Sequence, residues 1–374
     1  MAFHCERTVT VNPGKYVART LREATFENDS HLRYAGGVKK PLLLSALVSV
    51  SVLALAGCSS GATAPVSSAA SEEGVVNVVA STNVYGDIAS TIGGDRVRVT
   101  SIITSLTQDP HSYEATARDR LTVKGADLVL TNGGGYDSFM DALVDGSKAP
   151  VIAAVEFSHD YPGNAGHDHA DEHGGAHEDH ADEHDHGAEH GDHEGHNHIE
   201  GFNEHVWFDP HTMSHLVDDI AQHLGKLDPE GAAEYTRSAA ELTATLTEDE
   251  NRLAAIKAKA AGAGVFLTEP VPGYLAAAAG LKDLAPEGFA EAVEEGHDVP
   301  PATLLAAVDV VKGGSVRAVL TNSQTGGAET DKVVAAAKEA GVPVVAFTEI
   351  LPEGKSYAGW MRDAIDSLAS AVGA

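Results

Sequence analysis

Cysteine, positive charge and aromatic side chains are all scarce in this sequence. The 374 residues include two cysteines, Cys5 and Cys58, so neither a disulfide framework nor a cysteine-based zinc site can be built. The 25 Lys and Arg residues are outnumbered by 55 Asp and Glu, and the formal charge of -30 argues against nucleic acid or an anionic membrane surface as a partner. Aromatic residues form 5% of the chain, which disfavours an aromatic-lined pocket for an organic ligand. A metal site here must therefore use histidine and carboxylate ligands.

An apolar run at residues 42–56 follows Lys39 and Lys40. The run is shorter than the roughly 20 residues of a membrane-spanning helix, and it suits the apolar part of a signal peptide. It ends in Leu-Ala-Gly-Cys at residues 55–58, which resembles the bacterial lipobox, so Cys58 is the predicted lipidation site. A buried core helix ending at Gly57 is the alternative, but the Ser-, Gly- and Ala-rich residues after Cys58 are typical of a tether.

The first 37 residues fit no part of such a signal, because their polar stretch is too long. We therefore predict that translation starts at Val38 and that residues 1–37 are a mis-annotated extension. Residues 38–57 are then the signal peptide and residues 58–74 a flexible tether.

From Val75 onwards the pattern is that of an α/β protein. Short apolar runs predict strands at 75–80, 96–103, 127–131 and 151–155, and after a long helical segment at 265–268, 316–321 and 342–348. Periodic segments predict helices between them, at 85–92, 115–123, 274–279, 301–312, 330–340 and 357–371. Such alternation is typical of parallel sheets covered by helices on both faces.

The chain therefore divides into an N-terminal lobe at 75–211, a linking helical segment at 212–262 and a C-terminal lobe at 263–374. The linking segment is rich in Ala, Leu, Glu and Lys and has no strand pattern. It is interrupted at Leu227-Asp228-Pro229, with Pro229 expected as the first residue of the long helix.

A histidine-rich insert at residues 159–200 interrupts the first lobe. Its central stretch, 167–198, has eleven His and eleven Asp or Glu with no Lys or Arg, so we expect it to be disordered. Overlapping imidazoles and carboxylates predict a low-affinity metal collector. An acidic solvated loop with incidental histidines is the alternative. The collector histidines are His167, His169, His173, His177, His180, His184, His186, His190, His193, His196 and His198.

Four further motifs lie at strand ends or in the loops after them, where open α/β sheets bind ligands. They are Gln-Asp-Pro-His-Ser-Tyr-Glu at 108–114, Asn-Glu-His-Val-Trp-Phe-Asp-Pro at 203–210, Leu-Thr-Glu-Pro at 267–270 and Ala-Phe-Thr-Glu-Ile-Leu-Pro at 346–352. Two imidazoles and two carboxylates from a cleft between the lobes would neutralise a divalent cation and suit Zn²⁺ or Mn²⁺.

These motifs resemble those of the zinc/manganese substrate-binding lipoproteins of bacterial ABC importers, the cluster A-I family. Asp-Pro-His-x-Tyr-Glu matches residues 109–114, which implies His111 as the first ligand, and His-x-Trp-x-Asp-Pro matches 205–210, which implies His205 as the second. The family's third and fourth ligands follow the first and last strands of the second lobe, and these positions fall on Glu269 and Glu349. The resemblance covers roughly residues 75–374.

The resemblance implies an α/β fold of two lobes, each with a mainly parallel sheet, joined by one long rigid helix. It also implies a lipid-anchored, extracytoplasmic monomer that captures a metal ion in the inter-lobe cleft and delivers it to an ABC permease and its ATPase. The insert favours zinc, whereas Glu269, where typical zinc members have His, favours manganese. We expect zinc, with manganese as the alternative.

Two other functions are weighed against metal capture. A metal-dependent hydrolase needs an open coordination position, and no His-Glu-x-x-His helix is present in the sequence, so we do not expect an enzyme. A surface adhesin or metal buffer would act through the insert alone. His211 and His215 are expected on a helix surface, and Asp209 and Glu114 beside the ligands and not among them.

Overall fold

The computed structural model describes residues 74–162, 164, 199 and 201–374. The predicted extension, signal peptide and lipidation site at Cys58 lie outside these residues, as do the tether up to residue 73 and all the collector histidines. Within the described part of the chain, no helix is long and apolar enough to cross a membrane.

The first lobe is built on a four-stranded parallel sheet with strand order β2-β1-β3-β4. Val78 of β1 lies opposite Val99 of β2 and Leu128 of β3, so the most apolar strands occupy the centre of the sheet. The elements are β1 (Val76–Thr82), α1 (Asn83–Gly93), η1 (Gly94–Arg96), β2 (Val97–Ile103), α2 (Ala117–Lys124), β3 (Leu128–Thr131), α3 (Phe139–Val144), β4 (Val151–Ala153), η2 (Ala154–Phe157) and η3 (Val206–Phe208).

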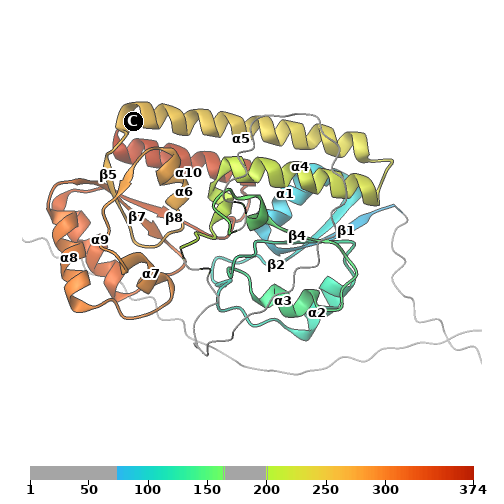
Figure 1. Cartoon of the computed structure of the whole chain (residues 1–374), viewed down its shortest axis with the longest axis horizontal. Coiled ribbons are helices and arrows are strands. Elements are labelled where there is room, and N and C mark those ends of the chain that lie inside the picture. The colour runs from blue at the N-terminus through green and yellow to red at the C-terminus, as the bar shows by residue number, and fades with distance from the viewer. Residues whose placement is uncertain (1–73, 163, 165–198, 200) are drawn as a thin grey trace, which may run out of the picture. The chain divides into compact units, whose positions relative to one another are not determined.

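Two helices follow the first lobe, α4 (Pro210–Leu227) and α5 (Ala232–Ala260). A four-residue turn joins them, and they pack along one another and so run antiparallel (Figure 1). The expectation that α5 begins at Pro229 was wrong, because residues 228–231 form this turn. The Asp228 carboxylate holds it by accepting hydrogen bonds from Arg96 Nε at 2.6 Å and from the Tyr235 hydroxyl at 2.7 Å.

The second lobe has another four-stranded parallel sheet, with order β6-β5-β7-β8. Its central strands β5 and β7 are almost wholly buried, with Leu267 opposite Leu320. The elements are β5 (Gly264–Leu267), α6 (Gly273–Ala278), β6 (Lys282–Asp283), α7 (Phe289–Glu294), α8 (Pro301–Lys312), β7 (Val316–Asn322), α9 (Ala328–Ala340), β8 (Val344–Phe347) and α10 (Tyr357–Val372).

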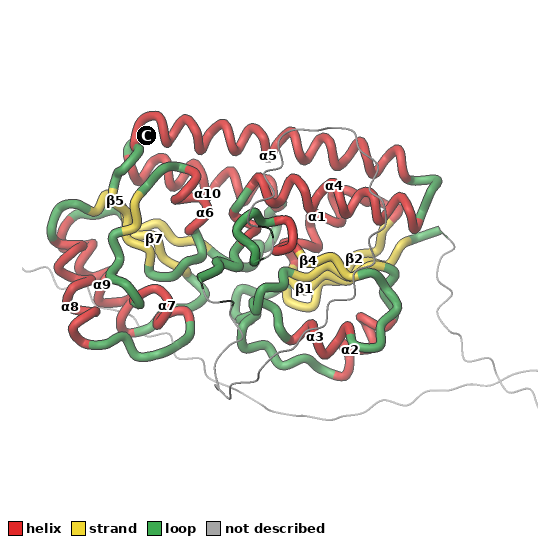
Figure 2. Tube along the Cα trace, in the orientation of Figure 1, coloured by secondary structure: helices red, strands yellow, loops and turns green. Residues whose placement is uncertain are grey.

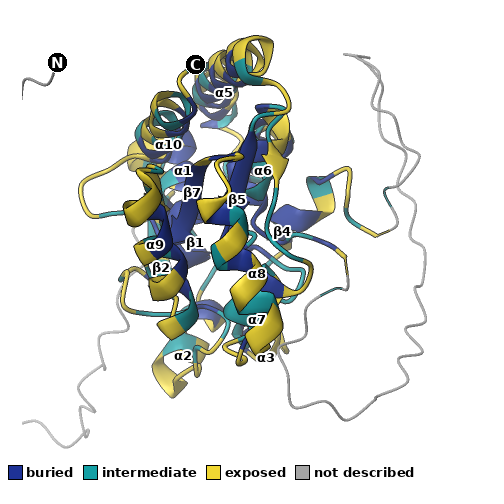
Figure 3. Cartoon of the chain, turned by 90° about the vertical axis from the view of Figure 1, so that its left-hand side faces the viewer, coloured by how far each residue is buried: buried dark blue, intermediate teal, exposed yellow. Residues whose placement is uncertain are grey.

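One apolar core is shared by the two sheets. It contains buried residues of β1, β7, α5 and α10, among them Val78, Leu320, Leu246 and Ile365. Besides α4, helix α5 contacts α1 of the first lobe and α6 and α10 of the second, so it spans both (Figure 1). Figure 3 shows the strands buried beneath helices whose outer faces are exposed.

Two smaller cores cover the remaining face of each sheet. In the first lobe this core includes Val129 and Met140, and in the second it includes Phe266, Phe289 and Val319. The described residues thus confirm the predicted fold class of two parallel-sheet α/β lobes flanked by helices. The loops that carry the predicted ligands lie at the facing ends of the two sheets (Figure 2).

Candidate metal centre

His111 stands in a tight turn after β2. The Asp109 carboxylate accepts hydrogen bonds from the backbone N–H of His111 at 3.0 Å and from the Ser112 hydroxyl at 2.7 Å, so it closes the turn as an Asx motif. The imidazole packs edge-on against Tyr136, with ring centroids 4.9 Å apart, and its side chain is 5% exposed. The turn therefore points this histidine inward although it belongs to a loop.

His205 precedes the short helix η3 and is completely buried. The side-chain oxygen of Asn203 lies 2.7 Å from His205 Nδ1 and accepts a hydrogen bond from the His205 backbone N–H at 3.1 Å. Because an amide oxygen can only accept, the proton of a neutral imidazole sits on Nδ1, and Nε2 carries the lone pair that a metal ion would need. The Asn203 amide also donates to the carbonyl oxygen of Pro270 at 3.1 Å, which ties this motif to the second lobe.

Glu269 and Glu349 are buried at the ends of β5 and β8 and are joined by one amide. Asn322 Nδ2 lies 2.9 Å from Glu269 Oε2 and 2.5 Å from Glu349 Oε1. Thr325 donates a further hydrogen bond to Glu269. Gln324 accepts from the backbone N–H of Glu349 at 2.6 Å. These contacts leave Glu269 Oε1 and Glu349 Oε2 buried without a hydrogen bond, so both carboxyl groups keep an oxygen for a cation.

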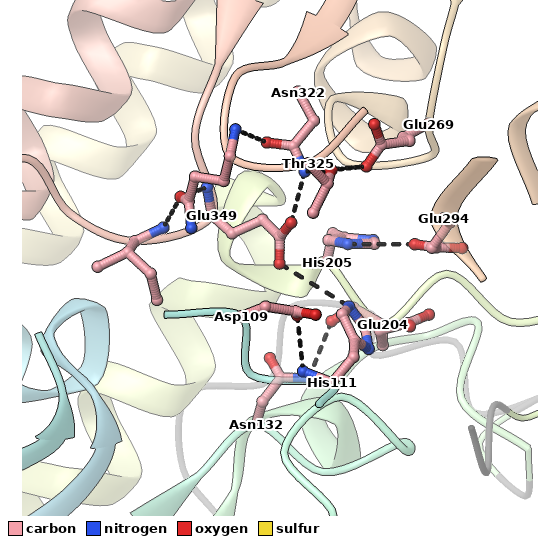
Figure 4. A network of polar contacts seen from close by, with 12 residues as sticks. Asp109, His111, Asn132, Glu204, His205, Glu269, Glu294, Asn322, Thr325 and Glu349 are labelled. Carbon is pink, nitrogen blue, oxygen red and sulfur yellow. Dashed lines mark hydrogen bonds and ion pairs between the residues drawn. The ribbon is translucent and has the colours of Figure 1, made fainter. Parts of the chain in front are cut away.

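The four predicted residues lie in one buried region (Figure 4). His111 Nε2 is 3.8 Å from Glu349 Oε2, and the ring centroids of His111 and His205 are 6.2 Å apart. Glu269 is linked to Glu349 through the amide of Asn322.

Two further carboxyl groups belong to the same region and were not predicted as ligands. One ligand atom from each of His111, Glu204, His205 and Glu294 lies within 4.8 Å of the other three. Glu294, the last residue of α7, places its Oε1 at 3.4 Å from His205 Nε2. Glu204 lies in the motif at 203–210, directly before His205, but nothing in the sequence distinguishes it as a ligand. Glu294 belongs to an acidic run at 291–295 that is typical of a solvated helix face.

Burial and the proximity of other carboxyl groups raise the pKa values of Glu349 and Glu294. The pKa of Glu349 is raised to about 8, mainly by burial; the hydrogen bond from Asn322 lowers it, and the nearby Glu269 and Asp109 carboxyl groups raise it. Burial raises the pKa of Glu294 to about 10, with added repulsion from Glu204 and Glu349. Without a cation, the raised pKa values favour the protonated form of both groups. A divalent ion would reverse the preference, because it favours the ionised form.

A glycine-rich loop shapes the wall beside the imidazoles. Gly133 has φ of +79°, and a Cβ there would stand 2.8 Å from a methyl group of Val155. The neighbouring Asn132 donates from its amide to the carbonyl oxygen of Glu204 at 3.0 Å. The loop thus positions Tyr136 and Glu204.

The sequence matches the protein family described as "Zinc-uptake complex component A periplasmic" over residues 78–371. The chain belongs to this family. The predicted family is therefore confirmed.

Similar proteins include binders of either metal. The manganese-binding lipoprotein MntA of Halalkalibacterium halodurans is 24% identical over 208 residues, which cover 54% of this chain and 54% of that protein. The zinc-binding protein AdcA of Streptococcus pyogenes is 25% identical over 308 residues, covering 79% of this chain and 56% of the relative. The chain thus spans about half the length of these curated relatives.

Among solved structures, the laminin-binding protein of Streptococcus agalactiae, described as having adhesin and metal-transporting activity, has a TM-score of 0.59. It is 21% identical, and the match covers 80% of this chain and 99% of that one. This likeness shows the fold.

The residues that the sequence analysis placed outside the ligand set make contacts away from the ligands or are exposed. Asp209 caps α4 by accepting hydrogen bonds from the Thr212 hydroxyl at 2.6 Å and from the backbone N–H of His211 at 3.3 Å. His211 is largely exposed, with Nδ1 at 3.6 Å from Glu250 of α5, and its ring meets that of His215 edge-on. Glu114 is exposed.

The raised pKa of Glu349 predicts a pH-dependent stability in the metal-free protein. The folded chain keeps a proton that the unfolded chain, with a pKa near the reference 4.5, has lost between about pH 4.5 and 8. The free energy of unfolding should therefore fall as pH rises through this window. Glu349→Gln is neutral throughout, so its unfolding free energy relative to the wild type should increase with pH.

Chemical denaturation with a strong chelator, at pH 5 and at pH 8, measures this difference. Glu295→Gln, at a more exposed carboxyl group, is the matched control and should follow the wild type. Parallel pH profiles for the wild type and Glu349→Gln would show that the buried carboxyl group has no such role.

Proposed function

We propose that this chain captures a divalent transition-metal ion, zinc in preference to manganese, where the two lobes meet, and delivers it to an ABC importer. The observation that carries the proposal is the approach of His111, from the first lobe, to Glu349, from the second, with 3.8 Å between Nε2 and Oε2. His111, His205, Glu269 and Glu349 are the proposed ligands. Two neutral imidazoles and two carboxylates balance the charge of a divalent ion.

The burial of the ligands suggests how the ion is taken up. Side chains of His111, His205 and Glu349 are 5%, 1% and 2% exposed, so entry of an ion requires a movement of the chain, which we propose to be a displacement of one lobe relative to the other. The shared core and α5 restrict that displacement. A small hinge movement is therefore expected instead of a wide opening.

Zinc is favoured by the ligand chemistry. Imidazole suits zinc well, whereas manganese prefers oxygen, and the general order of affinities places zinc above manganese. The eleven insert histidines fit a low-affinity zinc collector. Glu269 is the opposing feature, since it adds a second carboxylate where an imidazole would increase selectivity for zinc.

Delivery follows from family membership and from the start of the chain. The family is described as a component of a zinc-uptake complex, and one similar protein is named a manganese-binding lipoprotein. Together with the lipobox-like sequence at Cys58, this supports a lipid anchor on the extracytoplasmic face, with a permease and its ATPase as partners; a monomer is part of the proposal. No catalytic step is proposed, because four protein ligands close a zinc site to substrate.

Removal of either imidazole should abolish tight binding. His111→Ala or His205→Ala should weaken zinc affinity at least about 100-fold, because even residues that only orient a ligand contribute 10–100-fold. The measurement is competition with a chelator of known affinity, in a variant that lacks residues 165–198. His211→Ala, an exposed histidine outside the site, is the matched control. Loss of all tight binding on deleting the insert alone would instead support a metal buffer.

The metal preference is tested by offering equal zinc and manganese to the same insert-lacking variant. After exhaustive dialysis, elemental analysis should find zinc as the retained metal. Glu269→His should increase this preference, because it replaces an oxygen ligand by a nitrogen ligand. Retention of manganese by the parent variant would reverse the assignment of the metal.

Affinity should depend on pH with a defined sign. Binding needs Glu349 ionised, and burial raises its pKa to about 8 in the metal-free protein, so zinc displaces a proton. Both imidazoles must also be neutral, with a reference pKa of about 6.5. Affinity should therefore fall as pH decreases from about 8, and more steeply below about 6.5. Chelator competition at pH 5 and pH 7 tests this, and equal affinities would contradict it.

A further inference from the structure

The imidazoles of His111 and His205 are flanked by two different pairs of carboxyl groups. Glu269 and Glu349 form one pair, joined by Asn322. Glu204 and Glu294 form the other, and one oxygen of each lies within 4.8 Å of a nitrogen of both imidazoles. Figure 4 draws Glu349 and Glu294 on opposite sides of the imidazoles.

Glu294 is held in place by the second lobe. Phe289, in the first turn of α7, is fully buried and packs edge-on against Phe266 of β5, with ring centroids 5.2 Å apart. This anchor turns the last residue of a short acidic helix inward. The Glu294 side chain is only 10% exposed, and its buried Oε1 accepts no hydrogen bond. A buried carboxyl oxygen in this state is costly unless a cation or a proton compensates it.

Glu204 is held in place by the first lobe. Its backbone carbonyl accepts the Asn132 amide, and the residue is 2% exposed. Gly134, at φ +68°, lies beside it: a Cβ there would be in ordinary contact with the Glu204 Cβ at 3.5 Å and would crowd Phe202 at 3.1 Å. Glu204 and Glu294 thus converge on the imidazoles from separate lobes, as His111 and Glu349 do.

The number of ligands exceeds what one zinc ion can use. A closed zinc site takes four ligands at about 2.0–2.2 Å, while two imidazoles and four carboxyl groups surround this region. By ligand type and charge, each carboxyl pair together with the two imidazoles would supply a neutral set of four for a divalent ion. Among the described residues, ligand atoms of His111, His205, Glu204 and Glu294 already lie within 4.8 Å of one another. The two sets share His111 and His205, so they cannot both be filled by ions that need both imidazoles.

We propose that Glu204 and Glu294 form a second ion position that shares His111 and His205 with Glu269 and Glu349, and that one divalent ion moves between the two positions. This inference rests on the proposed function and adds an alternative ligand set to it. The ion keeps the two imidazoles as ligands while it exchanges one carboxylate pair for the other. The ion therefore never loses all its protein ligands at once during capture and release.

The test compares Glu294→Gln in two backgrounds of the full chain. In the wild type, loss of Glu294 should reduce zinc affinity little, because the other position remains. In Glu269→Gln/Glu349→Gln, the same change should reduce affinity at least about tenfold more, since coupled residues deviate from additivity by such amounts. A chelator strong enough to strip the insert is the competitor, and Glu295→Gln is the matched control.

A zinc anomalous map of the Glu269→Gln/Glu349→Gln crystal gives a local readout. The expected result is one ion within bonding distance of His111, His205, Glu204 and Glu294. An empty second position, or equal effects of Glu294→Gln in both backgrounds, would overturn the inference. If the double variant does not fold, the rate of zinc association is measured by stopped flow for Glu294→Gln and Glu295→Gln. Slower association to Glu294→Gln is expected, and equal rates would overturn the inference.

The failure of this inference is distinguishable from the failure of the proposed function. If His111→Ala and His205→Ala lose tight binding while Glu294→Gln behaves as Glu295→Gln, the capture function stands and the second position does not exist. If the histidine variants keep tight binding, both proposals are wrong.

Discussion

The apolar core shared by the two sheets is the constraint on which the site depends. Buried side chains of β1, β7, α5 and α10 form one continuous cluster, so neither sheet can move far without exposing it. Such exposure costs roughly 25 cal/mol for each Å² of apolar surface. The core therefore fixes which strand ends face one another, and hence which loops can contribute ligands to one ion.

Polar contacts across the lobes refine this arrangement near the ligands. Asn83, at the start of α1, donates to the carbonyl oxygen of Leu351 at 2.8 Å and accepts from its backbone N–H at 3.0 Å. The Tyr357 hydroxyl donates to the carbonyl oxygen of Trp207 at 2.8 Å. These bonds hold the segment after Glu349 and the segment after His205, so the two motifs are positioned by the same interface that they line.

Sequence reasoning succeeds here where the information is local and fails where it is not. The strands and the turn at Asp-Pro-His can be predicted from the sequence, because apolar periodicity and an Asx turn are short-range features. The burial of Glu294 cannot be predicted in this way, because it depends on Phe289 packing against Phe266 from another element. The role of Asn322 is equally hidden, since its one amide serves two carboxyl groups that lie far from each other in sequence.

A protein that delivers its ion must bind it tightly and still let it go, and the structure suggests how both are reconciled. A cage with four ligands and no alternatives would release an ion only by losing several bonds at once. In the proposed exchange, the additional carboxyl groups beside the same imidazoles replace ligands one at a time, so that the ion is never without ligands. Because Glu204 belongs to the first lobe and Glu294 to the second, a small separation of the lobes would weaken both ligand sets together. The geometry that closes the site thus also makes release sensitive to lobe position.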